Sequence, residues 1–376
     1  HGAALDRRAN DRATALHLAC AYGHMAAASL LIDRGSSVDS EDAEGGTALL
    51  NACANGHERM AQMLLARGAA LEHLDDSGRS ALLWTCANGH TAVARLLLER
   101  RASTQRFNEA GHTALLRAAA NGHMQTVHVL LEHHANLEHM SKSGASAFLH
   151  ACHHGHESVA RLLLDHGALL EHQTVQKWTA LLLASSNGHT ATAQMLLKRG
   201  AAIEHVDEQG CSALLHAVDS DYSGTARMLI EHGANVERAD AEGRTALQWA
   251  CMRGHVNTAQ VLLDAGADVD RISIDGRTGL MWACASDHEA VVRLLLDKKA
   301  TTRRMDCEGD TALSLADRRG FESIAELLRT HGTEWWRARR LVILLSRELM
   351  ILRAFTPPWK RGAPHSVTAE DKSLDA

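Results

Sequence analysis

The sequence predicts an all-α solenoid, in which short helical pairs stack side by side and bury their apolar faces against one another. The first observation is a strict period. A Thr or Ser followed by a small and then an apolar residue begins at Thr14 and returns every 33 residues, ten times in all, as far as Thr311. Such a period is typical of stacked arrays. The second observation is that 45% of the residues are hydrophobic but only 3% aromatic, which suits a Leu and Ala core between close helices.

One unit shows the elements in order. Thr47 is a natural N-cap, because its hydroxyl can accept a hydrogen bond from a free backbone N–H, and every unit has Thr or Ser there. Residues 48–55 are expected to form a short helix, which Gly56 ends in a left-handed conformation. A second helix is expected from His57, with one apolar face, as far as Gly68. The polar, turn-rich stretch that follows predicts a connecting loop, called a finger below.

Each unit resembles the ankyrin repeat through a motif that reads, in the second unit, Asp42-x-x-Gly45-x-Thr47-Ala48-Leu49-x-x-Ala52-x-x-x-Gly56-His57, then Leu64-Leu65 and Gly68-Ala69. The resemblance covers residues 1–332. It implies a right-handed α-solenoid of helix–turn–helix units with projecting β-hairpin fingers, used for protein recognition and without shared catalytic chemistry. The family usually has Pro after the capping Thr. Ala stands there in most of these units, a change that costs a helix little.

The Gly-His turn between the two helices is not kept in every unit. In the seventh unit, Asp221-Tyr222 replaces the Gly-His turn, and Asp adopts the left-handed conformation less readily than Gly. We therefore expect a weak joint there. The chain also starts with His1-Gly2-Ala3, in register with His166-Gly167-Ala168. This register predicts that the chain opens inside an earlier repeat and is a fragment of a longer array.

The period stops after Gly332. Residues 333–355 carry a helical apolar stripe, and residues 333–361 hold seven Lys or Arg against two Glu. The stripe predicts an amphipathic helix that caps the last repeat, because a stacked array needs its terminal core covered. The alternative is a basic amphipathic helix that binds a membrane surface or another protein. Residues 356–376 are predicted to be a disordered tail.

An acidic residue recurs at one position on most fingers, and the next position is basic, with histidine at His73, His139, His172 and His205. One interpretation is that Glu–His and Glu–Arg contacts tie neighbouring fingers together. The other is a charged strip for a partner, sensitive to pH through the four histidines.

The candidate binding residues occupy the fourth position after the capping Thr or Ser, which varies while its neighbours stay constant. This position is expected on the concave side of the array, and exposed Trp, Arg and His are residue types that carry binding hot spots. The alternative is that the tryptophans pack against adjacent first helices. With nearby variable positions included, the predicted partner-binding residues are Trp84, Arg117, His150, His154, His216, Trp249, Arg253 and Trp282.

Enzyme and metal sites are not predicted. The sequence has no Gly-rich phosphate loop with a terminal Lys-Ser or Lys-Thr, no HExxH and no GxSxG, so we expect neither catalysis nor a cofactor. The histidine-rich run 150–156 resembles a metal cluster, but only His150 and His154 share a helix face, and zinc needs three or four converging ligands. A metal site is therefore not expected.

The sequence thus predicts a monomeric scaffold that binds a protein through its concave groove and fingers. The alternatives are a regulatory or substrate-docking segment of a larger enzyme or channel, and an adaptor recruited to membranes through residues 333–361. The net charge of −6 argues against nucleic acid as the partner. Eight cysteines without a CxxC pair indicate free thiols and an intracellular location, in the cytoplasm or alternatively the nucleus.

Overall fold

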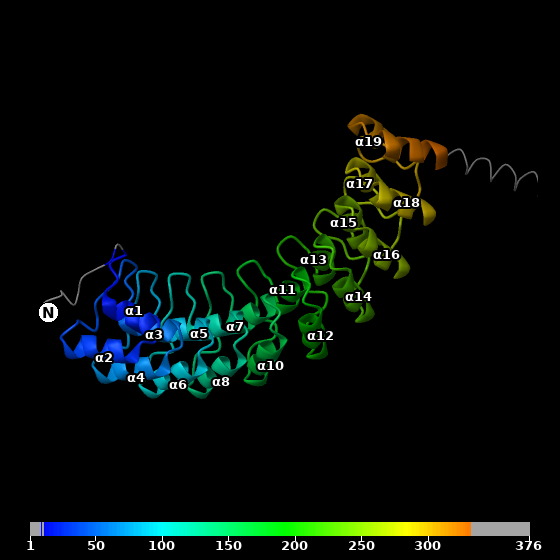
Figure 1. The fold of residues 1–376 in the computed structure, drawn as a ribbon. Helices are drawn as coiled ribbons and strands as arrows, with labels where there is room; N and C mark the ends of the chain where they lie inside the picture. The colour runs from blue at the N-terminus through cyan, green and yellow to red at the C-terminus, as the bar shows by residue number, and fades with distance from the viewer. Residues whose placement is uncertain (1–8, 10, 332–376) are drawn as a thin grey trace, which may run out of the picture.

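The computed structural model describes residue 9 and residues 11–331, which form a curved array of helical pairs (Figure 1). The first helix of each pair lies along the inner side of the curve, where the fingers project, and the second helix lies along the outer side. The first helices are α1 (Ala15–Ala21), α3 (Ala48–Ala54), α5 (Ala81–Ala87), α7 (Ala114–Ala120), α9 (Ala147–His153), α11 (Ala180–Ser186), α13 (Ala213–Asp219), α15 (Ala246–Arg253), α17 (Gly279–Ala285) and α19 (Ala312–Arg319).

The second helices pack behind them. They are α2 (Met25–Asp33), α4 (Glu58–Ala66), α6 (Thr91–Glu99), α8 (Met124–Glu132), α10 (Glu157–Asp165), α12 (Thr190–Lys198), α14 (Ser223–Glu231), α16 (Val256–Asp264) and α18 (Glu289–Asp297). A further helix runs over residues 322–331, where the described part ends. No helix of the described residues is long and apolar enough to cross a membrane. The predictions for residues 333–355 and 356–376, and for the first residues of the chain, lie outside the described residues.

The helix ends follow the predicted caps. The hydroxyl of Thr47 accepts a hydrogen bond from the N–H of Leu50. Gly56 has a φ of 74°, and the next residue, His57, donates its N–H to the carbonyl of Ala52 over 2.9 Å. A short helix can therefore end sharply and let the second helix return antiparallel to it.

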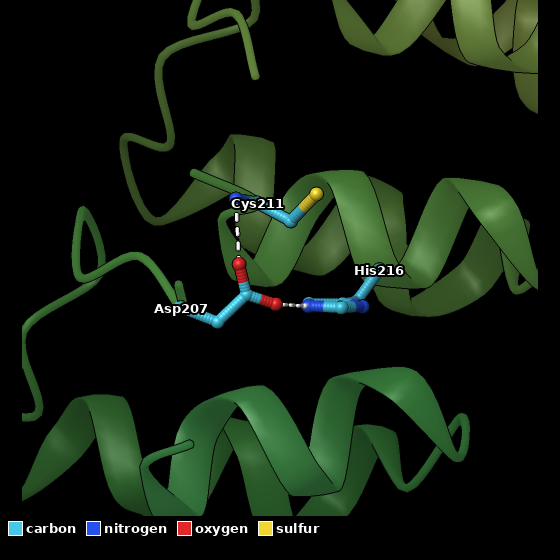
Figure 2. A group of neighbouring side chains, drawn as sticks. All are labelled: Asp207, Cys211 and His216. Carbon is cyan, nitrogen blue, oxygen red and sulfur yellow. Dashed lines mark hydrogen bonds and ion pairs between the residues drawn. The ribbon is translucent and has the colours of Figure 1, made fainter. Parts of the chain in front are cut away.

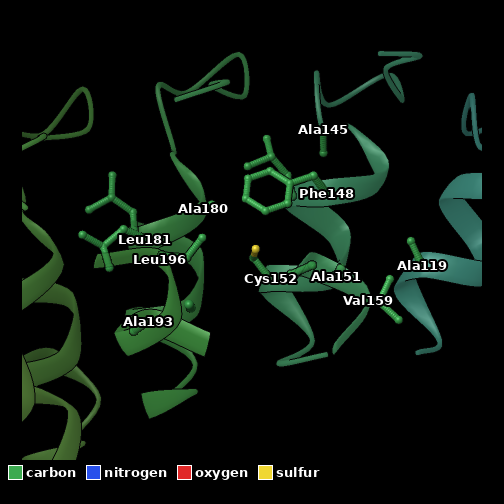
Figure 3. Packing of buried hydrophobic residues seen from close by; sticks show 14 of the residues in the cluster. Ala119, Ala145, Phe148, Ala151, Cys152, Val159, Ala180, Leu181, Ala193 and Leu196 are labelled. Carbon is green, nitrogen blue, oxygen red and sulfur yellow. The ribbon is translucent and has the colours of Figure 1, made fainter. Parts of the chain in front are cut away.

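The core runs the length of the array without interruption, because each first helix packs on the first helices of the adjacent repeats. Phe148 and Cys152 of α9, both fully buried, face the next repeat, where Leu181 and Leu196 belong to the same core (Figure 3). Cys53 and Cys86 occupy the same buried position as Cys152 in earlier repeats. Burial raises the pKa of the Cys53 thiol to about 12, so this column of cysteines is a set of small apolar core residues.

The fingers are loops with at most a single antiparallel bridge, such as Leu74 with Ser80, and no regular strand occurs in the described part of the chain. The prediction of β-hairpin fingers is therefore not confirmed. The physical reason is visible in the third repeat. The Oδ1 of Asp75 accepts the N–H groups of Ser77 and Arg79, so one side chain satisfies amides that a longer strand ladder would otherwise pair.

Two kinds of hydrogen bond join successive repeats. From the second repeat on, the histidine of a Gly-His turn bonds a carbonyl of the preceding repeat, as His90 does through Nε2 to the oxygen of Ala54 over 3.0 Å. A backbone amide at the fingertip bonds the preceding finger, as Asp76 does to Glu44. The turn histidines are therefore scaffold residues that link each repeat to the one before it.

The joint between the sixth and seventh repeats lacks both of these bonds among the described residues. Tyr222 stands where the histidine would be and makes no such bond, and no fingertip amide of the seventh repeat pairs with the sixth finger. Asp221 adopts the left-handed conformation, with a φ of 58°. Other hydrogen bonds still cross this joint, such as those between Thr190 and Thr225 and between His205 and the carbonyl oxygen of Lys177. The weak joint expected from the sequence therefore stays a prediction.

Candidate partner-binding groove

The predicted binding residues all lie on, or at the end of, first helices and thus along the inner side of the array (Figure 1). His154 and Arg253 are exposed. The other six are partly buried: Trp84, Arg117, His150, His216, Trp249 and Trp282. The three tryptophans among them pack against the continuous core. The predicted residues are spread over repeats three to nine, so they line a groove and do not converge on one point.

Trp84 belongs to a network of three side chains in the third repeat. Its indole Nε1 donates to Oδ2 of Asp75 over 2.9 Å, and Arg79 donates to the same oxygen over 2.7 Å. The guanidinium of Arg79 also lies 4.0 Å from the centre of the Trp84 ring. The finger is thereby fastened to α5, and the tryptophan is held in one orientation.

The eighth repeat contains the same arrangement. Trp249 donates to Asp240 over 2.8 Å, and Arg244 bonds that carboxylate and lies 4.5 Å from the ring centre. Arg253 covers the ring as well, at 5.5 Å, while it pairs with Asp219 over 2.7 Å. Trp84 and Trp249 are therefore packed and hydrogen-bonded in their own repeats, and each keeps a partly exposed surface on the groove.

The seventh repeat has Asp207, Cys211 and His216 at the corresponding positions (Figure 2). His216 Nε2 lies 2.7 Å from Asp207 Oδ2, and its ring centre is 4.4 Å from that of Trp178. Asp, Cys and His are residue types that bind zinc. However, the contact between Asp207 and His216 repeats the bond between aspartate and tryptophan in the third and eighth repeats. The scaffold therefore accounts for this cluster.

Repeats four to six lack this carboxylate, because Asn108, Ser141 and Thr174 take the place of the aspartate. His150 is the residue most affected, since its Nε2 is buried without a hydrogen-bond partner. Burial lowers the pKa of His150 to about 4, and the positive groups around it lower it further: His112, His154, His153 and Arg117. The ring centres of His112 and His150 are 5.1 Å apart.

A pocket of about 540 Å³ opens beside His150, between the fingers of repeats five and six. Lys142 and Val175 line it from the fingers, and Trp178 and Leu183 from the sixth repeat. No carboxylate lines it. Neither Lys142 nor Arg117, whose charge acts on His150, forms an ion pair with any residue that the structure describes. The structure thus brings the predicted residues Arg117, His150 and His154 together at one place in the groove.

The sequence analysis did not predict the finger aspartate that bonds the groove side chain of the same repeat. A constant spacing of nine residues could have indicated it, from Asp75 to Trp84, from Asp207 to His216 and from Asp240 to Trp249. The finger histidines are also accounted for. His73 Nε2, for example, lies 2.9 Å from the carbonyl oxygen of Gly45, and Glu72 accepts the N–H of Ser103 on the next finger. These contacts support the interpretation that neighbouring fingers are tied together.

Stacked helix–turn–helix pairs with fingers along an open inner groove define a helical repeat protein. The family model for ankyrin repeats, which spans three copies, matches residues 1–75, 67–141, 133–207, 200–273 and 270–338. The chain therefore belongs to the ankyrin repeat family, whose members are generally protein–protein interaction modules and typically non-catalytic. A search of curated proteins returned no match.

Proposed function

We propose that this chain is a non-catalytic interaction scaffold that binds a partner protein through its concave groove and fingers. The observation that carries the proposal is the row of partly exposed Trp, Arg and His side chains along the inner face of an array whose core is mainly Leu and Ala. Residues of these types, held in fixed positions, are those that contribute most to protein interfaces. Free thiols throughout the described chain support a reducing, intracellular location.

The groove has two kinds of side chain. Trp84 and Trp249 are held by their aspartates, so they need little further ordering when a partner binds. Arg117 and His154 make no ion pair among the described residues, so a partner can engage them without breaking an existing one. We propose that the partner contacts both kinds, and that the array acts as a monomer.

A peptide library displayed on phage and selected on the full chain tests this proposal. The selected ligands are then measured against a double variant in the groove, Arg117→Ala with His154→Ala. The matched control is Arg227→Ala with His128→Ala, which removes the same two residue types from the outer helices α14 and α8. Alanine at Trp84 is a poorer test, because it also leaves the buried Asp75 without its indole partner.

The proposal predicts ligands that lose at least about tenfold in affinity on the groove variant and keep their affinity for the control. Ligands that bind the groove variant and the wild type equally well would place the binding surface elsewhere. A library that yields no ligand at all would also count against a peptide-binding groove.

A further inference from the structure

We propose that the pocket between the fingers of repeats five and six binds a short acidic segment of the partner, with an apolar side chain beside the carboxylates. In this arrangement a carboxylate contacts Lys142 and His150, and the apolar side chain lies against Trp178 and Leu183. The inference rests on the proposed function and specifies the chemistry of the ligand.

The chain itself shows what an imidazole at this position binds. In the seventh repeat, His216 occupies the position of His150 and bonds the carboxylate of Asp207 at 2.7 Å. In the fifth repeat, Ser141 replaces that aspartate, and His150 Nε2 is buried with no partner. A buried polar nitrogen without a hydrogen bond is costly, so a turn of the His150 ring toward a carboxylate bound in the pocket is favoured.

The charges around the pocket favour the same ligand. Lys142 lies on the fingertip that borders the pocket, and Arg117 is among the charged groups that act on His150. Neither has an acidic partner within the described residues. Every titratable group that shifts the pKa of His150 is positive or becomes positive on protonation, and none is acidic. A carboxylate would therefore be attracted by Lys142 and Arg117 and would meet no acidic group among those that act on His150.

The opposite wall of the pocket is apolar. Trp178 is half-buried against the core, Leu183 is partly exposed next to it, and Val175 on the fingertip is 72% exposed. With a volume of about 540 Å³, the pocket can accept a Leu-sized or aromatic side chain. An aromatic wall beside a charged rim suits a peptide in which acidic residues flank one apolar residue.

The acidic stretch is expected to be short, because acidic fingertips flank the pocket on both sides. Fingertip acids precede it at Glu44, Asp76 and Glu109, and follow it at Glu208, Glu242, Asp275 and Glu308. Only the fingertips of repeats five and six, over residues 142–143 and 175–177, carry Lys without Asp or Glu in this series. A long polyanion such as a nucleic acid would be repelled by these flanks, whereas a few carboxylates fit between them.

Calorimetric titration of the full chain tests the inference with three probes. The first is the acetylated and amidated peptide EELDE, the second its neutral counterpart QQLNQ, and the third a single-stranded oligothymidine. We expect the acidic peptide to bind at least about tenfold more tightly than the neutral one, and the oligonucleotide to bind no more tightly than the neutral peptide. Equal affinity for the two peptides would overturn the inference, as would preferential binding of the oligonucleotide.

Two variants locate the site. Ser141→Asp places a carboxylate beside His150, as in the seventh repeat, and is expected to weaken binding of EELDE at least about tenfold. Lys142→Gln removes the charge of an exposed side chain, so the variant is expected to fold like the wild type. We expect it to weaken binding of EELDE severalfold. Lys198→Gln on the outer helix α12 is the matched control and should bind like the wild type. Unchanged binding in Ser141→Asp and Lys142→Gln would overturn the site.

The library selection separates this inference from the proposed function. If the selected ligands depend on the groove but are neutral or basic, and Ser141→Asp leaves their affinity unchanged, the proposal of an acidic ligand in this pocket is wrong while the scaffold function stands. If no ligand depends on the groove, both proposals fall.

Discussion

The indole N–H of Trp84 donates to the carboxylate of Asp75, nine residues earlier, over 2.9 Å. This contact joins a finger to the first helix that follows it. Trp282 holds the same position in the ninth repeat, but the residue nine positions before it is Ser273, and the Trp282 indole nitrogen is buried without a partner. The indole N–H of this groove tryptophan thus has a hydrogen-bond partner in the third repeat and none in the ninth.

The first prediction is that Ser273→Asp stabilises the array. The new carboxylate would accept the indole N–H of Trp282 and lie beside Arg277, as Asp240 lies beside Arg244. We expect a gain of about 1 kcal/mol in the free energy of unfolding, which urea denaturation followed by circular dichroism would measure. Asp240→Ser is the reverse change and should destabilise by a similar amount. A lower stability for Ser273→Asp would show that repulsion from Asp275 outweighs the new bond.

The second prediction separates two roles of the glycines that end helices. Gly68 has a φ of 86° with open space around it, so Gly68→Ala should cost about 1 kcal/mol, from the backbone conformation alone. At Gly89, which has a φ of 74°, an added Cβ would lie 2.5 Å from Nδ1 of His123. Gly89→Ala should therefore cost about 3 kcal/mol, because the histidine must also move. Equal losses of stability in urea denaturation would show that the turn histidine gives way freely.

The third prediction concerns the joint between repeats six and seven. Replacing Asp221-Tyr222 by the Gly-His of the other turns removes a non-glycine residue at a φ of 58° and restores an imidazole able to bond the preceding repeat. We expect about 1 to 2 kcal/mol of added stability and slower amide hydrogen exchange in α12 and α14. The single variant Asp221→Gly separates the backbone change from the new imidazole, and Thr258→Val, which removes the donor to the Asp221 carboxylate, measures the bond to the eighth repeat that Asp221→Gly also loses. An exchange rate unchanged in the double variant would mean that the joint is already as stable as its neighbours.

The fourth prediction follows from the lowered pKa of His150, which is about 4 in the folded chain against an ordinary value of 6.5. Below about pH 6.5 the unfolded chain takes up a proton at this residue, while the folded chain does not until the pH nears 4. The unfolded state is therefore favoured as the pH falls, and full stability returns above about pH 6.5.

The matched variant is His150→Leu, since the next repeat has Leu183 at the same position. Between pH 7.5 and pH 5, the wild type should lose about 1 to 2 kcal/mol more stability than the variant. Thermal unfolding at a series of pH values would measure the difference. Parallel pH profiles for the two proteins would contradict the assignment of the effect to His150.

The period and the apolar pattern of one repeat were enough to predict the helical pairs, their caps and the buried positions. The reason is that each unit packs only on its neighbours, so the same local signals, such as Thr47 at a cap and Gly56 at a turn, repeat in every unit. The inner position of Trp84 and its equivalents followed from the same periodicity.

Only the tertiary structure decides which groove side chains already have a hydrogen-bond partner within the chain. The bond between Trp84 and Asp75 crosses from finger to helix, and the surroundings of the unpartnered His150 Nε2 come from the fourth and fifth repeats. Hydrogen bonds and burial depend on distances between atoms remote along the chain, which a repeating pattern of residue types does not contain. For the same reason, the sequence did not predict the pocket beside Lys142, which residues from the fingers of both repeats five and six line.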